Sequence, residues 1–299
     1  MAVDGLLILN KATGMTSHDV VAKVRKILHQ KRVGHAGTLD PAASGVLPIC
    51  VGQATRVAEY LSESGKAYQA EITFGIVTDT YDSEGTIIRT ADTAGLTQDQ
   101  IEAELVHFLG PQMQMPPLYS AIKIQGQPAY KRSRAGEAIE LDPRPIEIFQ
   151  LQIRAWLPPR LTLAIECSKG TYIRSLAYDL GERLGCGGYL TSLVRTRSGP
   201  FSLTDSITLE QLAEAVTQGT VESHLFSPDR ALQQYPALML DDTTTQRVLH
   251  GNAFSYHDDN VVAAELARVY DSAGKFLAIA TWDTEQGLWQ PKKVLAKNC

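Results

Sequence analysis

The sequence has few cysteines, and none of them stands in a metal-binding or redox spacing. The four cysteines are Cys50, Cys167, Cys186 and Cys299. None belongs to a Cys-x-x-Cys pair, and no His/Cys cluster has the spacing of a zinc site. Cys50 and Cys167 lie in apolar runs, so we expect both thiols to be buried and reduced. The sequence therefore predicts neither a structural disulfide nor a structural metal.

Long hydrophobic runs are also missing. No apolar segment approaches the roughly 20 residues that a membrane-spanning helix needs, and the N-terminus lacks the pattern of a signal peptide. Hydrophobic residues make up 44% of the sequence and charged residues 20%, which is ordinary for a globular protein. We expect a cytoplasmic protein, and the length of 299 residues suggests about two domains.

An overall excess of positive charge is the third feature that is missing. The net charge is −5, which taken alone argues against a nucleic-acid-binding protein. Binding to phosphates, however, needs only a local basic surface. One short stretch with a single acid, Asp19, contains Lys11, Lys23, Arg25, Lys26, Lys31 and Arg32. A second basic group consists of Lys123, Lys131, Arg132 and Arg134. Either group fits a phosphate-binding surface or an ordinary solvated face.

The hydrophobic pattern predicts an α+β fold around a largely antiparallel or mixed sheet. Strands are expected at 5–10, 46–51, 68–74, 146–156 and 161–167, and helices at 16–28, 54–61, 97–109 and 172–184, without a repeating βαβ order. The stretch 33–45 has the composition of a loop, and the Pro/Met/Gln segment 111–117 is expected to be irregular. Short alternating strands at 261–269 and 276–282 predict a small β-rich module. We divide the chain into a domain of residues 1–235 and a module of residues 236–299.

Asp40 is the residue with the most interesting chemical setting. Gly34, Gly37 and Pro41 surround it, so the backbone is suited to a tight, specific turn. Catalytic side chains are often found on such loops, where a rigid scaffold positions them. A structural alternative is that Asp40 caps a helix or closes an Asx-turn. For an arbitrary Asp-Pro in a loop, this alternative is the commoner case.

Arg174 and Tyr68 are two further candidates. Arg174 stands in the first turn of a predicted helix, where a cation opposes the helix dipole. Such an arginine is easier to understand if it faces a carboxylate across a cleft, although a lone arginine usually points into solvent. Tyr68 begins a predicted strand, where a tyrosine is usually half-buried packing. In an RNA enzyme it would equally serve as a platform for a flipped base or as a proton acceptor.

Several ordered motifs together resemble the TruB-type tRNA pseudouridine synthases. They include Leu-Asn-Lys at 9–11, Gly-Met-Thr-Ser at 14–17, Gly-His-Ala-Gly-Thr-Leu-Asp-Pro at 34–41, Gly-Val-Leu-Pro at 45–48, Gly-Gln-Ala-Thr-Arg at 52–56, Cys-Ser-Lys-Gly-Thr-Tyr-Ile-Arg at 167–174 and Arg-Thr-Arg-Ser-Gly at 195–199. Together they extend from residue 5 to about 201. The C-terminal module resembles the PUA-like appendix of this family less closely.

The resemblance implies the pseudouridine synthase fold and the isomerisation of uridine 55 in the T arm of tRNA to pseudouridine. Neither a metal nor another cofactor is required, the partner is tRNA, and we expect a monomer. Asp40 matches the catalytic aspartate of the family, Arg174 the arginine that pairs with it, and Tyr68 the residue that stacks on the target base. Tyr172 and Leu193 match further positions of the base pocket. His35 matches the residue that fills the space left by the flipped nucleotide.

Several alternatives remain open at this point. Asp40 would act either as a nucleophile on C1′ or as the base that removes the 2′ proton and gives a glycal. Two alternative functions are the modification of another RNA site and the binding or folding of RNA without a chemical reaction. A glycosidase is disfavoured because such enzymes use paired carboxylates, and no second carboxylate is an evident partner for Asp40.

Overall fold

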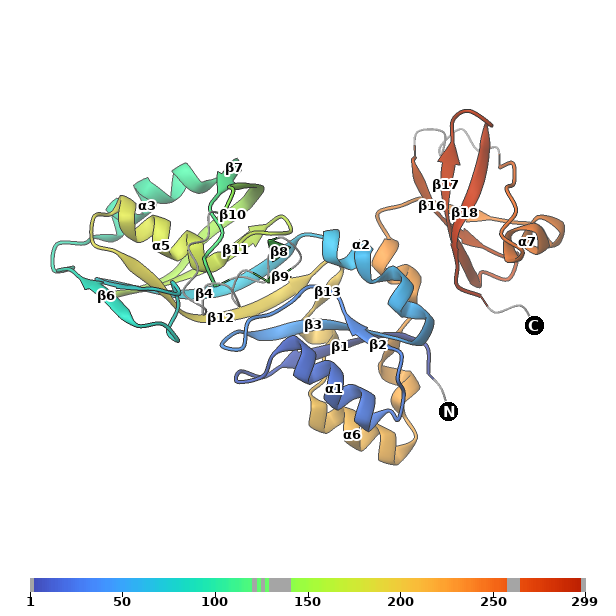
Figure 1. The fold of residues 1–299 in the computed structure, drawn as a ribbon, viewed down its shortest axis with the longest axis horizontal. Coiled ribbons are helices and arrows are strands. Elements are labelled where there is room, and N and C mark those ends of the chain that lie inside the picture. The colour runs from blue at the N-terminus through green and yellow to red at the C-terminus, as the bar shows by residue number, and fades with distance from the viewer. Residues whose placement is uncertain (1–2, 120–122, 125–126, 129–140, 257–263, 297–299) are drawn as a thin grey trace.

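The computed structural model describes residues 3–119, 123–124, 127–128, 141–256 and 264–296 of the chain. Its largest feature is a ten-stranded sheet with the order β14-β1-β3-β12-β4-β11-β10-β7, in which β2 also pairs with β3 and β13 with β12 (Figure 1). The strands of this sheet are β1 (Gly5–Lys11), β2 (Val33–His35), β3 (Ser44–Val51), β4 (Lys66–Phe74), β7 (Gly110–Gln114), β10 (Arg144–Leu157), β11 (Arg160–Cys167), β12 (Gly188–Ser198), β13 (Phe201–Ser202) and β14 (Leu225–Phe226).

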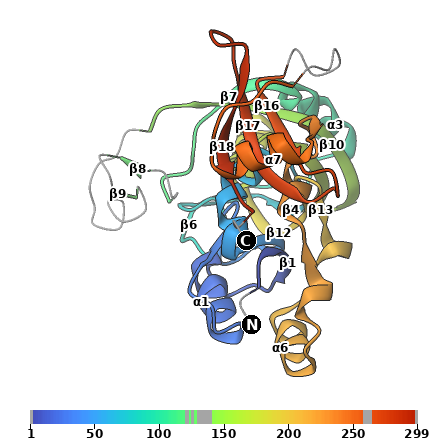
Figure 2. The ribbon, with the colours of Figure 1, turned by 90° about the vertical axis from the view of Figure 1, so that its right-hand side faces the viewer.

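Helices cover the two halves of this sheet separately. In Figure 1, α3 (Gln98–Leu105) and α5 (Ile173–Arg183) lie over the half that contains β4, β10 and β11. The pair α1 (Ser17–Ile27) and α6 (Leu209–Gln218) lies below the half that contains β1 and β3, as Figure 2 also shows from the side. Each half has its own buried core. The short helices η1 (Gly52–Val57) and α2 (Ala58–Glu63) pack against the N-terminal half.

The C-terminal module is a second sheet with the order β15-β16-β17-β18. Its elements are β15 (Ala237–Met239), α7 (Asp242–Leu249), β16 (Leu266–Tyr270), β17 (Phe276–Asp283) and β18 (Leu288–Val294). The module contacts the larger part through Lys293, whose Nζ lies 2.7 Å from both the backbone carbonyl of Arg56 and the carboxylate of Glu59. The large sheet ends before residue 235 and the small one begins after residue 236; the domain boundary between these residues stays a prediction.

The predicted α+β class, the mixed sheet and the β-rich module are confirmed, with corrections to single elements. The stretch 33–45 is not loop throughout, because β2 occupies its first residues and β3 begins at Ser44. The predicted helix 97–109 ends as α3 at Leu105 and continues as the 3-10 turn η2 (Val106–Phe108). Two small antiparallel pairs are β5 (Ile76–Thr78) with β6 (Ile87–Thr90) and β8 (Lys123–Ile124) with β9 (Gln127–Pro128). The remaining described elements are the 3-10 helices η3 (Leu203–Asp205), η4 (Val221–His224) and η5 (Pro228–Leu232).

The prediction that residues 111–117 are irregular is wrong for the first half of that segment. Gly110–Gln114 forms β7, and within the described ranges it pairs only with β10, at the edge of the sheet. A proline cannot donate to a neighbouring strand, and for this reason it is tolerated at an edge but not in the middle of a sheet. Pro111 is therefore compatible with the place of β7 at this edge.

The pairing of β12 with β3 is the parallel contact in a sheet whose other pairs are antiparallel, and it joins the two halves. Val194 stands opposite Ser44, and Arg195 opposite Gly45. A Cβ atom at Gly45 would lie 2.3 Å from the carbonyl oxygen of Arg195, so only glycine allows this approach. The loop between β2 and β3, which contains Asp40, therefore emerges directly beside the junction of the two halves.

Candidate active site

Three buried polar side chains, those of Ser17, Lys11 and Arg195, fix the loop that contains Asp40. The Ser17 hydroxyl, at the start of α1, accepts a hydrogen bond from the Leu39 amide at 2.9 Å and donates one to the Leu39 carbonyl at 3.1 Å. The Lys11 ammonium donates to the carbonyls of Ala12, Met15 and Pro41 at 2.8–3.3 Å. Both side chains are almost completely buried.

Arg195 holds the same loop from the opposite side. Its guanidinium donates to the carbonyl oxygens of Val46 (2.7 Å), Thr38 (3.2 Å) and Gly37 (3.0 Å). Gly37 has a φ of +87°, a left-handed conformation that glycine adopts without strain. Because Arg195 satisfies the loop carbonyls on one side and Ser17 the Leu39 amide on the other, the position of Asp40 is fixed by the scaffold.

Arg174 forms the ion pair that faces Asp40. Its Nε lies 3.0 Å from Asp40 Oδ2, and the guanidinium is only 7% exposed, whereas the Asp40 side chain is 44% exposed. The alternative in which this arginine points into solvent is therefore wrong. Nε has no hydrogen-bond partner of good geometry, so the contact with Asp40 is mainly electrostatic. The Asp40 carboxylate also makes no cap or turn hydrogen bond with the backbone of the described residues.

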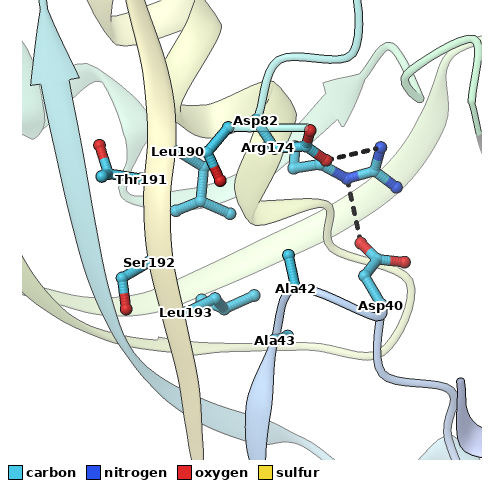
Figure 3. A pocket seen from close by; sticks show the side chains of 10 residues that line it. Asp40, Ala42, Ala43, Asp82, Arg174, Leu190, Thr191, Ser192 and Leu193 are labelled. Carbon is cyan, nitrogen blue, oxygen red and sulfur yellow. Dashed lines mark ion pairs between the residues drawn. The ribbon is translucent and has the colours of Figure 1, made fainter. Parts of the chain in front are cut away.

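A second carboxylate, Asp82, approaches the same guanidinium from another side (Figure 3). Its Oδ2 lies 3.5 Å from Arg174 Nη1, and its side chain is 11% exposed. Its other oxygen accepts hydrogen bonds from the Thr80 hydroxyl (2.6 Å) and the Glu84 amide (3.0 Å). Arg174 thus lies between two carboxylates, of which the one on Asp82 is buried and the one on Asp40 faces open space.

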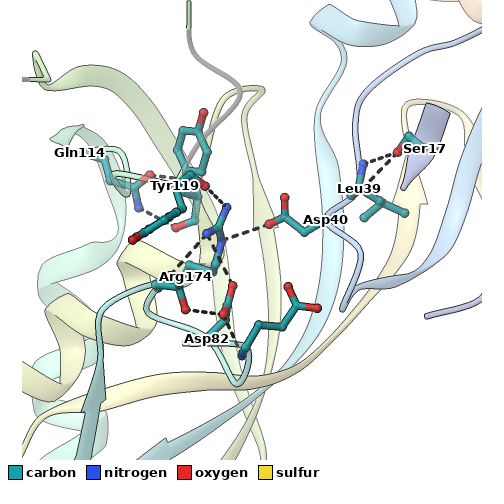
Figure 4. A network of polar contacts seen from close by, with 10 residues as sticks. Ser17, Leu39, Asp40, Asp82, Gln114, Tyr119 and Arg174 are labelled. Carbon is teal, nitrogen blue, oxygen red and sulfur yellow. Dashed lines mark hydrogen bonds and ion pairs between the residues drawn. The ribbon is translucent and has the colours of Figure 1, made fainter. Parts of the chain in front are cut away.

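The segment after β7 completes the surroundings of Arg174 (Figure 4). Arg174 Nη2 donates to the Tyr119 carbonyl at 3.0 Å, and Nη1 lies 3.4 Å from the Thr80 carbonyl. The Gln114 side-chain amide bridges the backbone of Tyr172, accepting from its amide at 2.8 Å and donating to its carbonyl at 3.0 Å. The edge strand β7 therefore positions the first turn of α5, from which Arg174 reaches the site.

A cavity of about 400 Å³ opens beside Asp40. Its lining includes five of the six predicted site residues, namely Asp40, Tyr68, Tyr172, Arg174 and Leu193. Ligand-binding cavities in proteins typically have volumes of roughly 300–1,000 Å³, so the space suits a small cyclic group such as a nucleobase. A second, much smaller cavity is lined by Asp40, Arg174, Asp82 and residues 190–193 of β12.

Tyr68 and Leu193 come from adjacent antiparallel strands, β4 and β12. Tyr68 stands opposite Arg195 in the register, and Leu193 stands opposite Ala70. Burial raises the pKa of the Tyr68 hydroxyl, whereas the neighbouring Arg195 lowers it. At neutral pH the Tyr68 hydroxyl is therefore protonated and lies against a fixed positive charge.

His35 is the predicted site residue that does not line the cavity. It lies in β2, five residues before Asp40, and its ring packs edge-on against that of His18 with centroids 5.2 Å apart. Its Nδ1 is buried without a hydrogen-bond partner among the described residues. Burial lowers the pKa of His35, and the nearby charges of His18 and Arg195 lower it further. Its role in filling the space of a flipped nucleotide stays a prediction.

Sequence reasoning missed five residues that build the site: Lys11, Ser17, Lys66, Asp82 and Arg195. Lys11 was placed in a basic group, but it is buried. Ser17 and Arg195 occur in the quoted motifs, but the sequence assigned no contact to them. Lys66 lies two residues before the strand predicted to begin at Tyr68. Asp82 lies in the polar turn between β5 and β6, where no hydrophobic period shows which side chain points inward.

The burial of Lys11 gives a prediction about stability and pH. Burial lowers the pKa of Lys11 from 10.5 to about 8, although the Asp40 charge raises it in part. Between pH 8 and 10.5 the unfolded chain therefore binds more protons at Lys11 than the folded protein, so folding stability rises with pH in this window. Relative to a Lys11→Met variant, the wild type should gain up to about 3 kcal/mol in free energy of unfolding. Denaturant titrations at pH 8, 9 and 10 measure this difference, and a constant difference would contradict the assignment.

Sequence comparisons show to which family the chain belongs. Residues 25–173 match the model of the TruB family pseudouridylate synthase N-terminal domain, residues 174–235 match the tRNA pseudouridylate synthase B C-terminal domain, and residues 236–295 match the C-terminal part of pseudouridine synthase II TruB. The chain belongs to the TruB family of pseudouridylate synthases. The family resemblance seen in the motifs is thus confirmed.

Individual relatives match this chain over nearly its whole length. A Dehalococcoides mccartyi protein named tRNA pseudouridine synthase B is 43% identical over 99% of this chain and 98% of its own length. One of the same name from Bacillus pumilus is 41% identical over 99% of both chains. A chain in the crystal structure of a Cbf5-Nop10-Gar1 complex is 26% identical, with a TM-score of 0.75 over 98% of this chain and 85% of that chain. The predicted pseudouridine synthase fold is therefore confirmed.

Two further findings concern the described residues as a set. Within the ranges that the structure describes, no three His, Cys, Asp or Glu side chains gather as the ligands of a metal ion would. No helix in those ranges is long and apolar enough to cross a membrane. Cys50 and Cys167 are buried with free thiols, as the sequence predicted.

Proposed function

We propose that the protein, acting as a single cytoplasmic chain, isomerises uridine 55 in the T arm of tRNA to pseudouridine with Asp40 as its essential carboxylate. The main support is the Asp40–Arg174 pair, which faces a nucleobase-sized cavity lined by Tyr68, Tyr172 and Leu193. Relatives that are 41–43% identical over 99% of the chain and carry the name tRNA pseudouridine synthase B support tRNA as the substrate.

The proposed reaction breaks the bond from N1 of uracil to C1′ of the ribose and joins C5 to C1′ instead. Asp40 either bonds to C1′ as a nucleophile or takes the 2′ proton, which gives a glycal, and later returns it. The proton on C5 is released, and N1 takes up a proton, so the product is an isomer of the substrate. Tyr68 would stack on the base and assist the removal of the C5 proton, while Arg174 orients the Asp40 carboxylate.

The target uridine must leave its stack to reach the cavity, which costs a few kcal/mol. We propose that His35 occupies the space that the nucleotide leaves, and that the buried Nδ1 without a partner finds one in the RNA. The exposed Lys23, Lys26 and Lys31 on and after α1 would contact phosphates. Arg25 and Arg32 of the same stretch already donate to protein groups. Of the second basic group, Lys131, Arg132 and Arg134 lie outside the described residues.

Mapping of pseudouridine in tRNA tests the proposal. Cells that lack the gene are complemented with the wild type or with Asp40→Asn, and the modification is mapped at single-nucleotide resolution. We expect pseudouridine at position 55 with the wild type only. In vitro, a T-arm stem-loop should be modified at the same uridine, and a stem-loop with cytidine at that position should not react. Modification only at another RNA site, or none at all, would contradict the proposed substrate.

A further inference from the structure

Among the described residues, two buried cations of the cleft form no ion pair with a carboxylate. Lys66, at the start of β4, is 6% exposed, and Arg195, on β12, is 1% exposed, and both line the 400 Å³ cavity. Among the described residues, no carboxylate oxygen lies within ion-pair distance of either. Lys66 donates to the carbonyls of Ser62 and Ser64. Arg195 donates to the loop carbonyls of Gly37 and Thr38 and to the Val46 carbonyl in β3.

The two positive charges lie close to each other. A Cβ atom placed on Gly37 would lie 3.6 Å from Arg195 Nη1 and 3.8 Å from Lys66 Cε, so both side chains border the same point of the Asp40 loop. Burial lowers the pKa of Lys66 to about 8, and the positive charge of Arg195 contributes to this decrease. The Tyr68 hydroxyl and the Asp40 charge offset part of the cost of burying Arg195. The carbonyls themselves could be held by neutral donors, so the rest of the cost of two buried cations calls for another explanation.

Negative charge that appears only during the reaction supplies such an explanation. When the N1–C1′ bond breaks, its electron pair stays on the pyrimidine, and the detached base carries one negative charge. At that moment the base has no covalent bond to the RNA, and it must turn before C5 reaches C1′. Fixed positive charges in a site that excludes water stabilise such a species without any rearrangement.

We propose that Lys66 and Arg195 hold the negative charge of the uracil base while it is detached from the ribose. This inference rests on the proposed function. It differs from the role of Arg174, whose guanidinium is already shared by Asp40 and Asp82. An RNA phosphate is the other source of negative charge that these cations would bind, and the experiment separates the two.

Lys66 is tested with Lys66→Gln, which keeps hydrogen-bond donors for the Ser62 and Ser64 carbonyls, and with Lys66→Arg, which keeps the charge. With a T-arm stem-loop, we expect Lys66→Gln to lower the single-turnover rate constant about 10²-fold, with the Tm, the Kd and the salt dependence of binding unchanged. Lys66→Arg should stay within about tenfold of the wild type. The exposed Lys169→Gln removes one positive charge outside the cavity and should react at the wild-type rate.

Arg195 also holds the Asp40 loop, so it is tested by a matched pair. Arg195→Lys and Arg195→Gln both lose the guanidinium, but only the second loses the charge. We expect the glutamine variant to react at least about tenfold more slowly than the lysine variant. Equal rates would show that the role of Arg195 is structural.

The remaining outcomes are also decisive. A weaker Kd and a smaller salt slope for Lys66→Gln, with an unchanged rate constant, would assign the charge to a phosphate and overturn the proposal. A loss of rate that Lys66→Arg does not restore would overturn it as well. If the wild type itself fails to modify the stem-loop, the proposed function is wrong. If the wild type turns over and Lys66→Gln matches it, only the present inference is wrong.

Discussion

An Asp40→Asn variant is expected to lose at least about 10⁴-fold in the single-turnover rate of pseudouridine formation while it still binds the T arm. Asparagine has the same size as aspartate, but its amide neither bonds to C1′ as a carboxylate does nor takes up a proton at neutral pH. Arg174 keeps its contact with Asp82, so the frame around the loop should persist. Release of tritium from C5-labelled RNA measures the rate, and filter binding measures the Kd.

Folding should change little in this variant, because the Asp40 side chain is 44% exposed and its ion pair is partly screened by solvent. Asp19→Asn is the matched control, since Asp19 is an exposed acid whose carboxylate accepts a hydrogen bond from the amide of Thr16, the N-cap of α1. It removes one negative charge from the N-terminal half and should leave the rate constant unchanged. If Asp40→Asn turned over at a rate near that of the wild type, the assignment of Asp40 as the essential carboxylate would be wrong.

The sequence predicted local structure well because periodicity records which face of an element is buried. In β4, the alternation of Ala70, Ile72 and Phe74 indicated one buried face, and all three side chains are buried. Capping patterns were equally informative, since Thr16 and Asp19 form the reciprocal bonds that begin α1. The edge strand β7 was missed because a proline-rich segment has no such period and its pairing with β10 is a long-range contact.

The site was predictable only through the family motifs, since its contacts join residues far apart in the chain. Arg174 meets Asp40 across 134 positions, as the two residue numbers show, and neither local pattern specifies this contact. Asp82 is the clearest example of a site residue that local sequence patterns do not identify. It was not recognised as a site residue because a carboxylate in a polar turn usually faces solvent, and only the packing of that turn beside α5 brings it to Arg174.

Because Arg174 contacts both Asp40 and Asp82, we expect Arg174→Met to lower both the folding stability and the reaction rate strongly. Loss of the guanidinium leaves the buried Asp82 carboxylate without a cation, and breaking a buried ion pair costs about 3–5 kcal/mol of folding stability. The same change removes the group that orients Asp40, and misplacement of a catalytic group by about 1 Å costs on the order of 10²-fold in rate. Urea denaturation and single-turnover kinetics measure the two losses separately.

A double variant separates the structural role of Arg174 from its role at Asp40. Arg174→Met combined with Asp82→Asn has no unpaired buried charge, so most of the lost stability should return. The rate should stay low, because Asp40 still lacks its partner. Arg183→Met, on the same helix, breaks the partly exposed pair with Glu104 and the contact of the guanidinium with the Phe108 ring. It should cost about 1 kcal/mol without loss of rate. If the double variant regained the wild-type rate together with its stability, Arg174 would be a structural residue, and the site would depend on Asp40 alone.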